Sequence, residues 1–233
     1  MLTNILKIII FLVIFFPKQI LAIEDEEIFH MFKLESDVAE SKEGTLYNWD
    51  LDGWIGGDIN KLSLKSEGEK IKDKNTEKST FWAKYSRNIA TFWDFQAGFR
   101  HDIHPKSKNY FLIGLEGLAP YFFETEAHVF ISEDGNLTTT IHQENEFLIT
   151  QRLIIQPYFE LNLSTQDVQD LEIGSGLTVG EFGLQTRYEY TRKFSPYIDI
   201  KYERKYGETS IIAQKNNKKN EDFMVGFGIR LMF

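Results

Sequence analysis

Hydrophobic and polar residues alternate along most of the chain that follows residue 22. The clearest run ends the chain, where every second residue from Phe223 to Phe233 is apolar. The residues between them are Met224, Gly226, Gly228, Arg230 and Met232. Similar alternation marks residues 92–101, 151–163 and 177–191. A period of two predicts β-strands that have one apolar face and one polar or glycine-containing face.

The spacing of these runs predicts about twelve strands of about 10 residues each. Their expected bounds are 29–39, 45–55, 61–69, 79–88, 92–101, 109–118, 121–131, 136–145, 151–163, 177–191, 194–206 and 222–233. Short connections fall at 57–60, 89–91, 119–120, 146–150 and 192–193. They alternate with generally longer, polar connections at 41–45, 69–78, 101–108, 132–135, 164–175 and 207–221. Short turns at one end and long loops at the other indicate an all-β, transmembrane antiparallel up-and-down β-barrel.

Alternation by itself leaves the direction of the apolar face open. In a soluble sandwich or lipocalin-like barrel the apolar face would form the core, whereas in an outer-membrane barrel it would contact lipid. The connection lengths favour the membrane barrel. Aromatic residues near the predicted strand ends favour it as well, because such residues concentrate at the two membrane interfaces. They are Trp49, Trp54, Trp82, Trp93, Tyr121, Phe122, Tyr188, Tyr190, Tyr197 and Tyr206.

The first 22 residues have the features of a cleaved signal peptide. Lys7 precedes an apolar run at Ile8–Phe16, and the small residue Ala22 ends the segment. The apolar run is too short to cross a bilayer as a helix, which needs about 20 residues. We therefore expect export to the outer membrane, a short acidic lead at 23–30 and a single barrel domain at 31–233.

Composition excludes several classes of function. The chain has 26 basic and 35 acidic side chains, hence a net charge of −9, so general nucleic-acid binding is not expected. Cysteine is absent, which excludes thiolate metal sites, disulfides and thiol nucleophiles. Glycine-rich phosphate loops are missing, and no serine accompanies a histidine on the lipid-facing positions around His142. We expect no enzymatic activity.

Several longer motifs carry a resemblance to a known family. They are the residues at 54–58 (WIGGD), 93–102 (WDFQAGFRHD), 114–124 (GLEGLAPYFFE), 150–157 (TQRLIIQP), 160–162 (ELN), 174–177 (GSGL), 187–189 (RYE) and 194–197 (FSPY). Together they resemble the copper resistance protein B family of outer-membrane proteins, over about residues 46–233. The resemblance implies an outer-membrane barrel in copper homeostasis, with copper ions as bound ligand and a periplasmic multicopper oxidase as partner.

The chain departs from this family in one respect. Many members carry a segment rich in Met and His between signal peptide and barrel, which suits Cu(I) and Cu(II). Here the segment before the barrel holds only His30 and Met31, and the whole chain has 4 Met. Any copper binding is therefore expected to depend on the barrel.

The polar face of the predicted strands is strongly acidic. Its acidic residues are Asp50, Asp52, Glu67, Asp94, Asp102, Glu116, Glu124, Glu126, Glu144, Glu160, Glu181, Glu189, Asp199 and Glu203. Its basic residues are Lys65, Lys84, Arg100, Arg187, Lys201 and Arg230. Such charges could simply pair and hydrate inside a narrow barrel, or they could attract cations and favour their passage.

Two histidines fall on the acidic face of one predicted hairpin. A three-residue loop at Asp134-Gly135-Asn136 would set His128 opposite His142 and Glu126 opposite Glu144. Directly opposed residues bring their Cβ atoms to about 4.5–5.5 Å. Two imidazoles and two carboxylates would suit Cu(II) or Zn²⁺, although both histidines could instead be hydrated or paired.

Two further sets of residues are weaker candidates for metal binding. His101, Asp102 and His104 are expected at the start of a long loop at the outer mouth, and His30 with Met31 is expected near the periplasmic rim. The sequence thus favours an outer-membrane barrel that binds copper and passes or retains it in an acidic lumen. The alternative is a general small porin or structural outer-membrane protein without metal preference.

Overall fold

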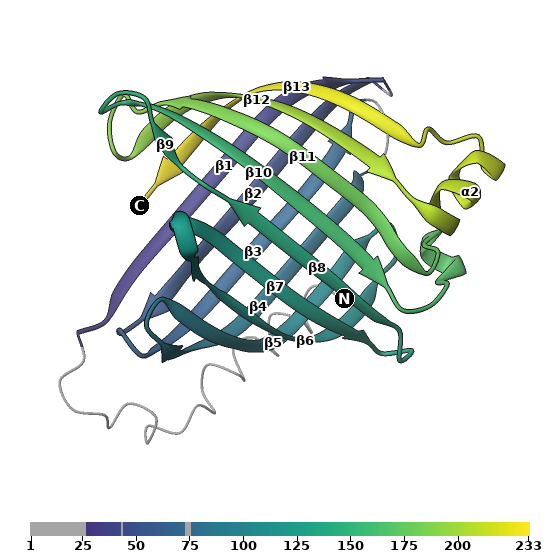
Figure 1. Ribbon diagram of the computed structural model, residues 1–233, viewed down its shortest axis with the longest axis horizontal. Coiled ribbons are helices and arrows are strands. Elements are labelled where there is room, and N and C mark those ends of the chain that lie inside the picture. The colour runs from purple at the N-terminus through teal and green to yellow at the C-terminus, as the bar shows by residue number, and fades with distance from the viewer. Residues whose placement is uncertain (1–26, 43, 73–75) are drawn as a thin grey trace, which may run out of the picture.

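The computed structural model describes residues 27–42, 44–72 and 76–233, and most of them belong to one closed sheet (Figure 1). The strands are β1 (Phe29–Ser41), β2 (Gly44–Gly56), β3 (Asn60–Ile71), β4 (Thr76–Ala90), β5 (Trp93–His104), β6 (Lys108–Ala119), β7 (Phe123–Ser132), β8 (Leu137–Glu144), β9 (Phe147–Leu148), β10 (Leu153–Ser164), β11 (Gly176–Tyr188), β12 (Phe194–Lys205) and β13 (Glu221–Met232). The signal peptide expected at 1–22 lies outside the described residues, as does the lead through residue 26.

All strand pairs in the barrel are antiparallel, and the sheet closes on itself. Each strand pairs with the next along the chain, except that β8 and β9 both pair with β10, and β1 pairs with β13 from Lys33↔Met232 to Glu40↔Val225. Closure leaves the long strands without a free edge, as a membrane requires, because lipid offers no hydrogen-bonding groups to an exposed backbone. The predicted twelve-stranded antiparallel barrel is confirmed, since β8 and β9 act as one strand.

Pro157 explains why β8 and β9 are separate. Both pieces pair with β10 in one register, as Tyr158↔Glu144 and Ile154↔Leu148 show. Between them the backbone N–H of Asn145 donates to the carbonyl of Pro157 at 3.2 Å, but proline has no N–H to return. The ladder is therefore interrupted at Asn145 and Glu146, and this break becomes important for the lumen.

The apolar face of the strands points outward. Phe99 and Phe227 are 68% and 64% exposed on the outer wall, whereas Lys84 and Arg187, on the inner face, are 2% and 3% exposed. This arrangement is the reverse of a soluble core and matches a barrel whose outer wall contacts lipid. The orientation expected from the sequence is confirmed.

The connections differ from those predicted at one end of the barrel. The expected loops at 69–78 and 101–108 are mostly strand, since β3 continues to Ile71 and β5 to His104. Polar residues continue the pairing there because strands can extend past the membrane into water. The long connections are 165–175, with a 3-10 turn at Gln169–Leu171, and 206–220, with helix α2 at Gly207–Lys215. We call this the loop end, where α2 projects from the barrel (Figure 1).

The opposite end, which we call the short-turn end, carries tight turns with aromatic residues. Phe92 and Tyr121 both have φ of 67°, and Tyr121 is 85% exposed at the centre of a 3-10 turn at Pro120–Phe122. Aromatic side chains at this level suit the membrane interface. Among the described residues, no helix has the length and apolar character needed to cross a membrane.

Candidate metal site in the acidic lumen

The barrel encloses a cavity of about 350 Å³ with a surplus of negative charge. Five basic side chains line it, namely Lys33, Lys65, Lys78, Arg100 and Lys201. Eleven carboxylates line it, namely Glu35, Asp37, Asp50, Asp52, Glu67, Glu69, Glu126, Glu144, Glu160, Glu181 and Asp199. The acidic lumen expected from the sequence is confirmed. Glu35, Asp37 and Glu69 were missed, although Glu35 and Asp37 alternate with apolar residues of β1 in the same way.

Three of the five basic side chains, Lys65, Lys78 and Lys201, are already paired with part of these carboxylates. Nζ of Lys65 lies 3.8 Å from Asp50 and 3.6 Å from Glu67, and Nζ of Lys78 lies 2.9 Å from Glu67. On β11 and β12, Glu181 and Lys201 are 3.6 Å apart. Among the described residues, Glu126, Glu144 and Glu160 on β7, β8 and β10 form no ion pair with a Lys or Arg side chain, and the ion pairs of Glu144 and Glu160 are with His142.

The register of the β7–β8 hairpin differs from the one predicted. Glu126 pairs with His142, His128 with Thr140, and Glu124 with Glu144. The three-residue loop is Glu133–Gly135, one residue earlier than expected, and Gly135 adopts φ of 80°. In such loops the left-handed residue is the third, so glycine belongs at the end of the loop rather than in its middle. The prediction that His128 faces His142 is therefore wrong.

His128 is held away from the acidic residues. Its Nε2 lies 2.7 Å from Oε1 of Gln96, and its ring meets Trp82 edge-on at 5.7 Å. The side chain is buried among these partners. His128 therefore has a structural role in the inner wall, and the predicted quartet of His128, His142, Glu126 and Glu144 does not form.

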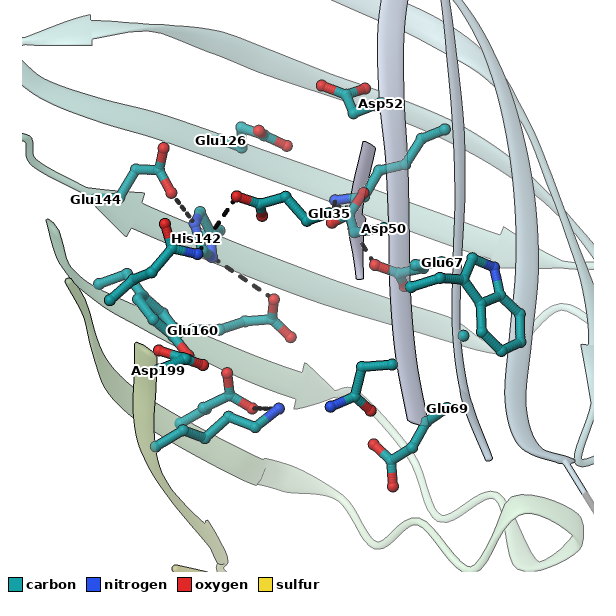
Figure 2. A pocket seen from close by; sticks show the side chains of 18 of the residues that line it. Glu35, Asp50, Asp52, Glu67, Glu69, Glu126, His142, Glu144, Glu160 and Asp199 are labelled. Carbon is teal, nitrogen blue, oxygen red and sulfur yellow. Dashed lines mark hydrogen bonds and ion pairs between the residues drawn. The ribbon is translucent and has the colours of Figure 1, made fainter. Parts of the chain in front are cut away.

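His142 instead lies among carboxylates from three neighbouring strands (Figure 2). Its Nε2 is 3.2 Å from Oε2 of Glu144, and its Nδ1 is 3.7 Å from Oε2 of Glu160. Glu126 lies directly across the ladder from His142. The ring also stacks on Tyr158 at 6.0 Å. One imidazole and three carboxylates thus meet in the lumen, and Glu160 is the member that the sequence did not single out as a ligand.

The other predicted ligands do not converge. Asp102 forms a two-point ion pair with Arg100 at 2.6 and 2.9 Å, while Nδ1 of His101 contacts Asn109 at 2.8 Å. Successive residues of a strand point to opposite faces, so His101 and Asp102 cannot share a metal ion. His104 is the last residue of β5, opposite Ser79 and next to a register shift, rather than part of a long loop.

His30 and Met31 also fall on opposite faces of one strand, at the start of β1. Met31 lies on the lumen face, opposite Trp54, and His30 lies on the outer face, opposite Ile55. Within the described parts of the chain, no group of three or more His, Cys, Asp or Glu side chains is arranged to hold a metal ion. At His142 the donors are engaged with one another, so metal binding there requires these side chains to rotate.

Comparison with known proteins identifies the family. Residues 28–233 match the family described as Copper resistance protein B precursor. The chain belongs to this family. The copper resistance protein B of Escherichia coli is 35% identical over 214 residues, which cover 91% of this chain and 72% of that protein. A copper resistance protein B homolog of Pseudomonas syringae pv. tomato is 36% identical over 195 residues, covering 83% and 66%.

Solved structures that resemble this copper resistance family member include porins. The NanC porin superposes with a TM-score of 0.58 at 12% identity, covering 85% of this chain and 98% of that chain. The KdgM porin gives 0.53 at 9% identity, covering 86% and 99%. At such low identity the likeness shows the fold alone, which is that of an outer-membrane porin barrel.

Proposed function

We propose that the protein binds copper ions inside its barrel and contributes to copper resistance by passing them through the lumen or retaining them there. The observation that carries this proposal is the surplus of carboxylates around His142. Carboxylate oxygens lower the electrostatic potential for cations, and an imidazole nitrogen adds affinity for Cu(II) over alkali and alkaline-earth ions. The family assignment supports copper as the ion concerned.

In this proposal the copper ligands are His142, Glu126, Glu144 and Glu160. Copper is cargo rather than a catalytic cofactor, and the protein acts without chemical turnover. His30 or Met31 would receive copper at the short-turn end, and His101, Asp102 or His104 would each meet it separately near the loop end. None of these outlying residues supplies more than one or two donors at one place.

The cellular setting is also part of the proposal. A signal peptide at 1–22 would direct export, residues 23–30 would form an acidic lead, and the barrel at 31–233 would lie in the outer membrane with lipid around its apolar wall. The short-turn end would then face the periplasm, where a multicopper oxidase would be a partner.

A direct test is Cu(II) titration of the refolded barrel, followed by calorimetry and electron paramagnetic resonance. We expect a site whose spectrum shows imidazole nitrogen, and we expect His142→Ala to lose that site. His128→Ala is the matched control, because it removes a lumen histidine that is bonded to Gln96 rather than to a carboxylate. Equal binding by wild type and His142→Ala would overturn the assignment of the ligands.

The competing function is a general porin without metal preference, with which the barrel fold shared with the NanC and KdgM porins is equally compatible. Cells that lack the gene and carry either wild type or His142→Ala separate the two functions. If the barrel handles copper, wild type should restore copper tolerance and His142→Ala should not. A general porin should leave copper tolerance unchanged in every strain.

A further inference from the structure

The lumen contains a second cavity that meets the first at His142. This lower cavity, of about 450 Å³, lies towards the short-turn end along β3 to β8. Its lining residues are Lys61, Asn88, Phe92, Asp94, Glu116, Gly117, Leu118, Glu124, Thr125, Glu126, His142 and Glu144. The main cavity is lined mostly by the other part of the barrel wall, which runs from β8 through β10, β12 and β1 to β3. Both cavities share Glu126, His142 and Glu144, which we call the neck.

An aromatic wedge fills the lumen above the lower cavity, at the loop end of β4 to β7. It is built around Arg100, whose guanidinium carbon lies 5.3 Å from the Trp82 ring, 5.1 Å from Tyr110 and 5.0 Å from Phe130. The three aromatic residues are buried although they face the lumen. Tyr110 and Phe130 lie within three residues of the loop-end termini of β6 and β7. An ion in the lower cavity therefore cannot leave straight upward along this wall.

An arginine network occupies the opposite wall at the short-turn end. The guanidinium of Arg187 donates to Gln156 and Glu146, and that of Arg230 donates to Glu35 and to Gln185 at 2.9 Å. Glu146 lies between the two arginines, 3.8 Å from Nη1 of Arg230. It reaches this position from the β8–β9 break that Pro157 creates. An ion in the main cavity therefore meets a closed, arginine-bearing wall directly below it.

From these two obstructions we infer that cations cross the barrel obliquely, through the neck formed by Glu126, His142 and Glu144. The aromatic wedge limits the size of the route at the loop end. Glu146 contributes to its preference for cations at the short-turn end, because it compensates two arginines that would otherwise attract anions. The inference rests on the proposed passage of cations, but it does not depend on the ion being copper.

The route can be tested with potassium chloride alone, by conductance and reversal potential of the refolded full-length protein in planar lipid bilayers. Joint substitution of the neck, Glu126→Gln with Glu144→Gln, should reduce potassium conductance severalfold. Glu146→Gln should shift the reversal potential towards that of chloride. Trp82→Ala should raise conductance while preference for cations is kept, since it removes part of the wedge.

Matched controls lie on the outer wall. Phe81→Ala changes the neighbour of Trp82 that points outward, and Glu40→Gln removes an exposed carboxylate on the outer face of β1. Neither should alter conductance or reversal potential. Heat-modifiable migration in detergent verifies folding of each variant, and Tyr110→Ala replaces Trp82→Ala if the latter does not fold.

Wild-type conductance by folded neck variants would overturn the oblique route, as would unchanged conductance in both wedge variants. A folded Glu146→Gln protein with the wild-type reversal potential would overturn the role of Glu146. A wild type that conducts no potassium would overturn passage, while Cu(II) titration would still decide whether copper is retained. Conversely, loss of copper binding would leave the conductance results intact, so the two proposals fail separately.

Discussion

His142 shows how the partner of one residue depends on the register of a hairpin. Alternation along β8 places the side chain in the lumen, and the sequence alone predicts this. Its cross-strand partner depends on which loop residue takes the left-handed conformation. When the loop moves by one residue along the chain, the residue opposite any given position changes by two. Here the shift exchanges His128 for Glu126, and a two-histidine site becomes one histidine among carboxylates.

Arg230 permits a stability prediction at the residue scale. Its guanidinium lies in the barrel wall and pairs with Glu35, joining the last strand to the first. Arg230→Leu should destabilise the barrel by about 1–3 kcal/mol, because the half-buried Glu35 carboxylate loses its charged partner and keeps only the hydrogen bond from Gln185. Unfolding by urea in lipid vesicles, followed by tryptophan fluorescence, measures the change.

The double variant Glu35→Leu with Arg230→Leu serves as the control. It removes both charges, so it should recover part of the stability lost in the single variant. Equal stability of wild type and Arg230→Leu would show that the ion pair does not hold the β1–β13 seam.

At the scale of elements, the two long connections of the loop end are tied to each other. Asn216 and Lys218 donate to the carboxylate of Glu172, and the backbone N–H of Gly174 donates to Oγ1 of Thr209 at 2.9 Å. These contacts join the 165–175 connection to the segment that contains α2. The Lys218 ammonium, with the Asn216 amide, holds the pKa of Glu172 below its usual range.

The lowered pKa of Glu172 gives this contact a predictable pH dependence. A carboxylate with a depressed pKa stabilises the folded arrangement above its ordinary pKa, and this stabilisation is lost as the pH falls through the lower, folded value. We expect hydrogen exchange in residues 165–175 and 207–220 to increase as the pH falls below about 4. The contact is solvent-exposed, so the change should be local.

Mass spectrometry of peptides, with exchange rates corrected for intrinsic pH dependence, measures this effect. Glu172→Gln is the control, because an amide does not titrate. If both proteins respond equally to acid, the Glu172–Lys218 contact does not hold the two connections together.

For the whole molecule, the orientation of the two strand faces governs all other properties. Apolar side chains on the outer wall match the lipid. The charged side chains that alternate with them therefore face the lumen. The closed sheet then places carboxylates from strands distant in sequence, such as those of β1 and β8, around one volume. An acidic lumen is therefore a consequence of closure as well as of composition.

Phe227 tests this orientation, because it lies midway along β13 on the outer wall. Phe227→Arg should cost about 2–4 kcal/mol, the range for a cation at the membrane midplane. The free energy of unfolding in vesicles is the measurement, and Phe227→Leu is the control that keeps the position apolar. An unchanged free energy for Phe227→Arg would mean that this face does not contact hydrocarbon.

Strand number and order were predictable because closure needs only neighbouring strands to pair in sequence. The lengths of the strands at the loop end were not, since nothing in the polar residues at 69–78 or 101–108 marks where pairing stops. The role of Glu146 was also hidden. It depends on Pro157, which lies on the neighbouring strand and interrupts the ladder only once the two strands are paired.

The sequence by itself determined the twelve-stranded barrel, the outward apolar face and the family, because alternation and motif are properties of consecutive residues. Only the tertiary structure decided which carboxylates surround His142, that His128 belongs to an aromatic wall, and that two obstructions lie on opposite sides of the lumen. The physical reason is that register and closure bring together residues separated by tens to hundreds of positions, and periodicity carries no information about those distances.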